Sequence, residues 1–284
     1  MATAILQQTA QPERTVDTRP DASGRLNPSD LGVTFPRVIR SEWVKFRSLR
    51  SNWLTLISTV LLIFGIGAIA AATFTAGSTD TDAFDDPISV GLSGNLLAQI
   101  VIGILGVLAI TGEFASGMIR STFASVPTRL PVLGAKALVL AGVTLVVAVP
   151  TMFGAFFLGQ ALISGDNASL TDTGVLRVII GSAGYLAAIA LLGLGLGTIV
   201  RQAAGAIGIV FVLLLLAPQL LGFLLPTSAQ DTFLKYLPSN AGSAITTVQS
   251  RSDLLSPLMG GIVLAGWVVG FLVIAAVLLK RRDA

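Results

Sequence analysis

The sequence predicts an all-α integral membrane protein with six transmembrane helices. Of its 284 residues, 53% are hydrophobic and only 12% are charged, whereas a soluble domain carries about 25% charged residues. The apolar residues gather in six segments, each close to the roughly 20 residues that a helix needs to cross a bilayer. We expect these spans at residues 53–74, 89–110, 132–158, 175–200, 203–225 and 258–279.

Two segments precede the first span. Residues 1–33 are polar and show neither helical nor strand periodicity, so we expect a disordered cytoplasmic tail. In residues 34–52, Pro36 suits the first turn of a helix, and Ile39 and Trp43 recur on one face while basic residues occupy the others. This pattern predicts an amphipathic interfacial helix in the headgroup region of the membrane. A plain cytoplasmic extension of the first span fits the same residues.

A polar connection, residues 111–131, joins the second span to the third. Within it Phe114 and Met118 lie four residues apart, as do Ile119 and Phe123, which predicts a short amphipathic helix at the membrane surface. A turn punctuated by prolines follows. Two interpretations fit these residues. Either a soluble partner acts on the membrane domain here, or the connection is a well-anchored loop without a partner.

The segment between the last two spans, residues 226–257, is long and of mixed polarity. An apolar and aromatic piece, residues 233–237, precedes the polar run that begins at Pro238. Two short helices lying against the outer face of the membrane would account for this mixture. An ordinary exposed loop accounts for it equally well.

The distribution of charge predicts which side of the membrane each loop faces. Cytoplasmic loops are enriched in Lys and Arg. With both ends inside, 15 of the 18 basic residues fall in the cytoplasm, and only Arg177, Lys235 and Arg251 do not. The opposite side receives 8 of the 15 acidic residues. We therefore expect a multi-pass protein of the cytoplasmic (plasma) membrane with its N- and C-termini in the cytoplasm.

The composition disfavours several kinds of chemistry. The absence of Cys and His removes thiol chemistry, the usual metal ligands and the usual proton shuttle. No Gly-Lys dipeptide occurs, so the chain has no Walker A loop to hold nucleotide phosphates. The centres of the predicted spans carry no Asp, Glu, Lys or Arg, whereas an ion-coupled transporter usually has an ionisable or discontinuous site there. We expect no catalytic, cofactor-binding or metal-binding residues, and no enzymatic activity in this chain.

Small residues and prolines inside the spans suggest how the helices pack. Gly193 and Gly197 lie four residues apart in the fourth span, a spacing typical of close contact between membrane helices. Pro150 and Pro218 are expected to kink the third and fifth spans.

Three regions together resemble a known family. They are the basic helix from Arg40 to Ser51, the long external segment before the last span, and the run Gly112-Glu113-Phe114-x-x-Gly117-Met118-Ile119-Arg120-Ser121-Thr122 followed by Val126-Pro127-x-Arg129 and Lys136. In these regions the chain resembles the permease subunits of ABC transporters of the ABC-2 type. The likeness runs from about Val38 to the C-terminus and makes residues 53–284 a permease domain.

The resemblance implies a half-transporter that pairs with a second permease copy, identical or different. A separate ABC ATPase subunit would dock on the cytoplasmic side and bind ATP and Mg²⁺. The connection after the second span would be a coupling helix, with Glu113 holding it through Arg120 or through a helix N-terminus. Carried over by position, the residues that contact the ATPase would be Glu113, Phe114, Gly117, Met118, Ile119 and Arg120, with Glu42, Trp43 and Lys45 of the N-terminal helix beside them.

Two functions follow as hypotheses. The first is an ATP-driven exporter that moves a drug, antibiotic, peptide or lipid-like molecule through the interface between two copies. Its partners would be the ATPase, the second copy and membrane lipid, with no role for nucleic acid. The alternative is a non-transporting membrane scaffold or an immunity protein, which needs neither an ATPase nor a path across the bilayer.

Overall fold

The computed structural model describes residues 34–75, 87–126, 128–163, 168–248 and 254–281. These belong to one compact unit, Thr34–Ala284. The predicted disordered tail, residues 1–33, lies outside the described residues. The elements in chain order are α1 (Phe35–Ser48), α2 (Arg50–Thr75), α3 (Pro87–Gly91), α4 (Asn95–Ala115), α5 (Met118–Ser125), α6 (Leu130–Leu162), α7 (Val175–Val200), α8 (Ala203–Phe211), η2 (Val212–Leu216), α9 (Ala217–Leu224), α10 (Thr227–Phe233), η3 (Leu234–Tyr236), α11 (Pro238–Thr246) and α12 (Pro257–Arg281).

Six helical segments of the described chain are long and apolar enough to cross a membrane, which confirms the predicted all-α architecture. They are Arg50–Thr73, Ile88–Ala115, Leu130–Leu162, Val175–Val200, Ala203–Leu224 and Pro257–Arg281. The first span begins at Arg50 rather than at residue 53, because the extended backbone of Leu49 ends α1 and α2 starts directly after it. Of the remaining boundaries, two differ most from the predicted ones: the second span continues five residues further, to Ala115, and the third continues four residues further, to Leu162.

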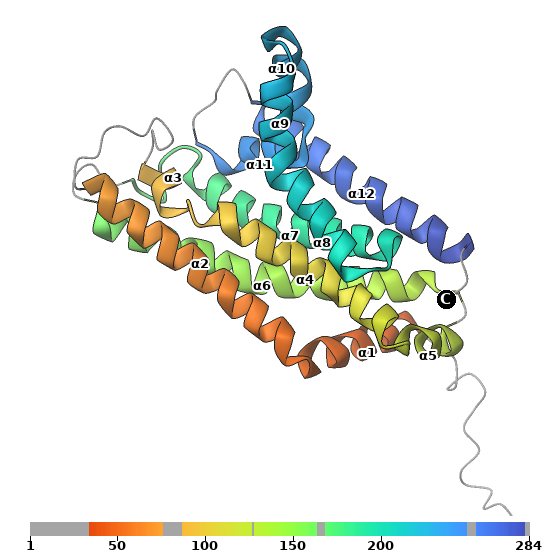
Figure 1. The fold of residues 1–284 in the computed structure, drawn as a ribbon. Helices are drawn as coiled ribbons and strands as arrows, with labels where there is room; N and C mark the ends of the chain where they lie inside the picture. Colours follow the sequence, from red (N-terminus) through yellow and green to blue (C-terminus); the bar gives the residue numbers. More distant parts are fainter. Residues whose placement is uncertain (1–33, 76–86, 127, 164–167, 249–253, 282–284) are drawn as a thin grey trace, which may run out of the picture. The chain divides into compact units, whose positions relative to one another are not determined.

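Helix α7 lies at the centre of the fold and packs against α4, α6, α11 and α12 (Figure 1). The predicted close packing at Gly193 and Gly197 is confirmed. A Cβ added at Gly193 would lie 2.3 Å from the carbonyl oxygen of Gly103 on α4, and one at Gly197 would lie 2.9 Å from that of Val107. The backbones of α4 and α7 therefore touch, and only glycine fits at these two positions.

The two prolines inside spans have different surroundings. Helix α6 runs through Pro150 without interruption. The fifth span instead changes its hydrogen-bond register just before Pro218. The N–H of Ala217 donates to the carbonyl oxygen of Val212, five residues back, in the π-helical turn η2. Proline has no N–H to donate, and a π-turn is a common way for a helix to accommodate such a gap.

The segment between the last two spans contains the two short helices expected of it, α10 and α11, with the 3₁₀ turn η3 between them. Helix α11 packs against α7 and α12. Arg177 Nη2 donates to the carbonyl oxygen of Thr247 at 3.1 Å, and Trp267 Nε1 donates to that of Tyr236 at 2.8 Å. This segment is therefore held against the fourth and sixth spans and is not an ordinary exposed loop.

The connection between the second and third spans is shorter than predicted. We expected a polar connection over residues 111–131, but α4 continues to Ala115 and α6 begins at Leu130. Helical hydrogen bonding persists through Thr111, whose hydroxyl donates to the carbonyl oxygen of Val107 within α4. What remains is helix α5 with a short turn on each side. Helices α1 and α5 lie at one end of the spans, and α10 and α11 at the other (Figure 1).

Candidate functional site

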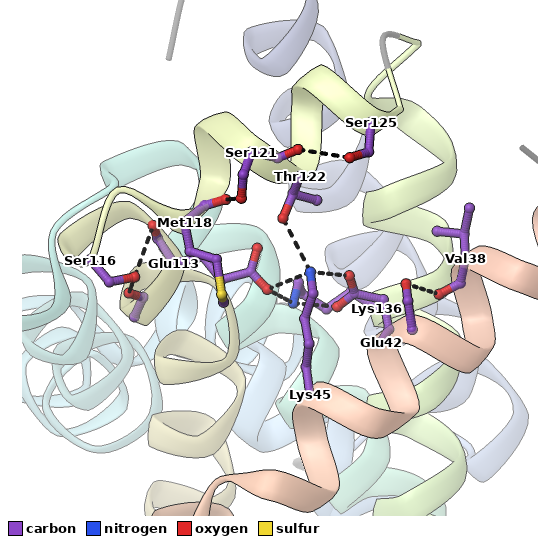
Figure 2. A network of polar contacts seen from close by, with 12 residues as sticks. Val38, Glu42, Lys45, Glu113, Ser116, Met118, Ser121, Thr122, Ser125 and Lys136 are labelled. Atoms are coloured by element: carbon purple, nitrogen blue, oxygen red, sulfur yellow. Dashed lines mark hydrogen bonds and ion pairs between the residues drawn. The ribbon is translucent and has the colours of Figure 1, made fainter. Parts of the chain in front are cut away.

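Four charged side chains from three helices meet beside α5 (Figure 2). Glu42 and Lys45 come from α1, Glu113 from the last turns of α4, and Lys136 from the second turn of α6. We call these four residues the ionic cluster. Glu42 points inward because α1 buries a stripe of residues four apart, Val38, Glu42 and Phe46. An acid therefore occupies the centre of an otherwise apolar helix face.

The geometry of the ionic cluster is that of a closed network. Lys136 Nζ lies 2.6 Å from Glu42 Oε2 and 2.7 Å from Glu113 Oε1. Lys45 Nζ lies 2.7 Å from Glu42 Oε1 and 3.2 Å from Glu113 Oε1. Each lysine thus bridges the same two acids, and the cluster fastens α1, α4 and α6 to one another.

Burial makes this network energetically demanding. Glu42, Glu113 and Lys136 are only 3%, 5% and 6% exposed, so each charge has lost most of its hydration. The two acids and two bases cancel in formal charge. Burial of Lys45 works against its charged form, but the carboxylates of Glu42 and Glu113 outweigh that effect and raise the pKa of Lys45 above its ordinary value. The cluster is consequently stable only as a complete set.

Helix α5 is seated on one face and exposed on the other. Gly117 has a φ of 72°, a conformation that glycine adopts without strain, and it turns the chain from α4 into α5. Ile119 and Phe123 are buried, whereas Met118 and Arg120 are exposed. Lys45 Nζ donates to the hydroxyl of Thr122 at 3.2 Å, which links α1 directly to α5.

Two arginines fasten the ends of this region to other spans. The guanidinium of Arg201, at the end of α7, lies 5.1 Å from the centre of the Phe114 ring. That of Arg129 lies 5.3 Å from the ring of Phe123, and its Nη1 donates to the carbonyl oxygen of Leu279 on α12 at 3.0 Å. Guanidinium groups over aromatic faces are attracted to them. The α4–α5–α6 connection is therefore in contact with the ends of α7 and α12 as well as with α1.

The nine residues predicted to contact a partner fall into two groups. Glu42, Lys45 and Glu113 belong to the ionic cluster, Ile119 is buried, and Phe114 lies under Arg201. The exposed ones are Trp43, Gly117, Met118 and Arg120. The contact with a partner remains a prediction for all nine.

The expectation that Glu113 holds the connection through Arg120 or a helix N-terminus is wrong. Glu113 instead pairs with Lys136 and Lys45. Arg120 lies on the exposed side of α5.

Lys136 is the cluster residue that the sequence-based set of contacts omitted. The predicted third span, residues 132–158, nevertheless places Lys136 near the start of a helix. Pro131 is well suited to the first turn of a helix, and it occupies that position in α6. A lysine five residues later therefore sits on a helix rather than in a loop, and a charge there needs a partner.

Comparison with known proteins identifies the chain. A family model described as ABC-2 family transporter protein matches residues 38–217. This chain belongs to the ABC-2 transporter family. The match covers more than half of the chain and contains α1 from Val38 onward, the ionic cluster and α5, and it confirms the resemblance drawn from the sequence. No curated protein matches the chain.

Membership in the ABC-2 family, together with the six apolar helices, makes this chain a multi-pass membrane protein. Its role is that of a transport component, a permease, which is not itself catalytic. The matched residues end at the start of α9, so α10, α11 and α12 lie beyond the family match.

Proposed function

We propose that this ABC-2 permease is the membrane half of an ATP-driven exporter, with a separate ATPase subunit docking on the exposed face of α5. The pair of permease copies forms the path in the cytoplasmic membrane, both chain ends lie in the cytoplasm, and the ATPase binds Mg²⁺ and ATP and hydrolyses the ATP. The observation that carries the proposal is the two-sided character of α5. Met118 and Arg120 are exposed while Ile119 and Phe123 are anchored in the protein.

Such an element can transmit force. A partner that seats α5 in a groove moves it as a rigid piece, because its buried face is packed and its ends are fixed. The Lys45–Thr122 bond passes this movement to α1, and the ionic cluster passes it to α6. Arg129 reaches the end of α12. Closing of the ATPase thereby tilts several spans at once.

The apolar surface that the chain leaves uncovered on its last two spans supports the proposed path and cargo. In the apolar stretch of the fifth and sixth spans, only 11% and 22% is buried inside the chain, compared with 61% in the fourth span. Their remaining surface is available to a second copy, to lipid and to a lipophilic cargo. We accordingly propose outward movement of an amphipathic or hydrophobic molecule, such as a drug, an antibiotic, a peptide or a lipid-like compound.

The alternative, a membrane scaffold or immunity protein, needs no ATPase, and one experiment separates the two. The permease is purified from its native membrane, any ATPase subunit that co-purifies with it is identified, and ATP hydrolysis is measured with candidate cargo. Met118→Ala is compared with Met259→Ala, a similarly exposed methionine on α12. Loss of a side chain that anchors a contact weakens binding by about 1–2 kcal/mol, about five- to thirtyfold.

We expect Met118→Ala to lower both ATPase retention and cargo-stimulated hydrolysis, and Met259→Ala to leave both unchanged. A permease that never retains an ATPase, yet protects cells as wild type does, would favour the scaffold or immunity role.

A further inference from the structure

A cavity of about 320 Å³ lies beside the ionic cluster. This volume is at the lower end of the roughly 300–1,000 Å³ found for small-molecule sites. Its walls come from α1, α4, α5 and α6 and from the junction between α1 and α2, and Glu113 and Lys136 line it. Of the two exposed residues proposed to contact the ATPase, Met118 also lines this cavity, whereas Arg120 does not.

The polarity of the cavity changes along the direction of the spans. Glu113 and Lys136 lie near the ends of α4 and α6. Leu108, five residues before Glu113, and Val139 and Leu140, three and four residues after Lys136, line the part of the cavity nearer the middle of the spans. The cavity is thus polar at the helix ends and apolar toward the membrane interior. A lipid in one leaflet has the same arrangement, with its headgroup at the surface and its acyl chains inside.

The cavity also has apolar residues exposed at its edge. Leu49 and Leu108 are 51% and 37% exposed and both line it. On a membrane-spanning unit, exposed leucines face acyl chains rather than water. We infer that an occupant enters sideways from the bilayer.

One hydrogen-bond acceptor in the cavity wall is unused. Glu113 Oε1 accepts from both lysines, but its second oxygen, Oε2, is buried and has no hydrogen-bond partner among the described residues. A buried carboxylate oxygen without a donor is destabilising. Because Oε2 is buried, a ligand reaches it only when a neighbouring side chain moves. Met118 lines the same cavity, and a methionine side chain is flexible enough to make such a movement.

We propose that this cavity binds a phospholipid of the adjacent leaflet whose headgroup carries a primary ammonium. The ammonium donates to Glu113 Oε2, and the start of an acyl chain lies against Leu108, Val139 and Leu140. Because the formal charges of the ionic cluster cancel, a zwitterionic phosphatidylethanolamine adds no net charge. A choline headgroup has no N–H and cannot make this bond. Under the proposed topology the leaflet is the cytoplasmic one.

The test measures lipid retained by the full chain. The protein is equilibrated with equal amounts of phosphatidylethanolamine, phosphatidylglycerol and phosphatidylcholine, and bound lipid is counted by native mass spectrometry. A charge-assisted hydrogen bond predicts retention of phosphatidylethanolamine over phosphatidylcholine by about tenfold or more. Retention of phosphatidylglycerol at the same level as phosphatidylethanolamine would overturn the assignment to an ammonium.

Variants that fill the cavity test its location. A side chain added at Gly112 meets nothing within 4 Å, so Gly112→Leu projects into open space beside the cavity, and Ala109→Phe fills the apolar part. Gly142→Leu is the matched control, since Gly142 on α6 is equally open and does not line the cavity. We expect the first two variants to lose the retained phosphatidylethanolamine and the control to keep it.

The proposal fails if wild type retains the ethanolamine and choline lipids equally. It fails also if Gly112→Leu retains lipid as wild type does. Loss of ATPase binding in Gly112→Leu, with lipid retention unchanged, would assign the cavity to a side chain of the partner subunit. If Ala109→Phe does not fold, the proposal is tested by the lipid retention of Gly112→Leu and by the lipid preference of wild type. Neither measurement needs the ATPase, so the outcome is separate from that of the proposed exporter function.

Discussion

Replacing Lys136 tests whether the ionic cluster stabilises the protein as a complete set. In Lys136→Met the side chain keeps its approximate length but loses its charge. Glu42 then loses its 2.6 Å contact and Glu113 its 2.7 Å contact, and the buried cluster carries a net charge of −1. Breaking a buried ion pair in this way lowers the free energy of unfolding by about 3–5 kcal/mol.

A second variant separates charge imbalance from lost packing. Lys136→Met combined with Glu113→Gln leaves Glu42 and Lys45, a neutral pair at 2.7 Å. We expect the double variant to recover a substantial part of the stability that the single variant loses. Free energies of unfolding are measured by titration with denaturing detergent in mixed micelles. A Lys136→Met variant whose stability lies within about 0.5 kcal/mol of wild type would refute the reasoning. So would a double variant that loses the sum of what Lys136→Met and Glu113→Gln each lose alone, because coupled charges are not additive.

Three further outcomes are expected. The raised pKa of Lys45 means that its pairing stabilises the protein fully below the unfolded-state pKa of about 10.4. This stabilisation is lost as the pH rises through the higher folded-state pKa. The difference in thermal stability between wild type and Lys45→Met should therefore begin to shrink above about pH 10.4 and disappear once the pH exceeds the folded-state pKa of Lys45, and a constant difference would argue against this pairing. Gly193→Leu should prevent normal folding, since a Cβ there would lie 2.3 Å from a backbone oxygen, whereas Gly184→Leu on the same helix meets nothing within 4 Å; equal yields of folded protein would contradict the packing. Thr122→Val should cost about 1 kcal/mol in unfolding free energy through the lost bond from Lys45, and a stabilised variant would count against that link.

The six spans could be predicted because hydrophobic length alone decides them. A helix needs roughly 20 apolar residues to cross a bilayer, and in the described part of the chain the six segments that meet this requirement correspond to the six predicted ones. The ends of α4 and α6 were less predictable. Polar side chains such as Thr111 and Glu113 indicated a loop, but helical hydrogen bonding continues through them, because the Thr111 hydroxyl and Glu113 Oε1 both find partners within the protein.

The ionic cluster could not be predicted from spacing. Its members are contributed by α1, α4 and α6, and residues 42, 113 and 136 meet only after the spans have packed. A lysine near a span end also satisfies the preference of basic residues for the cytoplasmic side. Because this preference already accounted for Lys136, its pairing with Glu42 and Glu113 was not predicted. By contrast, the spacing of Ile119 and Phe123 correctly indicated a short helix with one buried face. The spacing of Phe114 and Met118 did not, since Phe114 belongs to α4 and Met118 is exposed.

The central claim is that the exposed face of α5 lies on the cytoplasmic side, where an ATPase can reach it. The chain contains no Cys, so a single introduced thiol reports its own location. Met118→Cys is treated in intact cells with a maleimide that cannot cross membranes, alongside Phe233→Cys on α10, which is exposed at the opposite end of the spans. The account predicts labelling of Phe233→Cys in intact cells and of Met118→Cys only after the membrane is opened. Labelling of Met118→Cys in intact cells would contradict it.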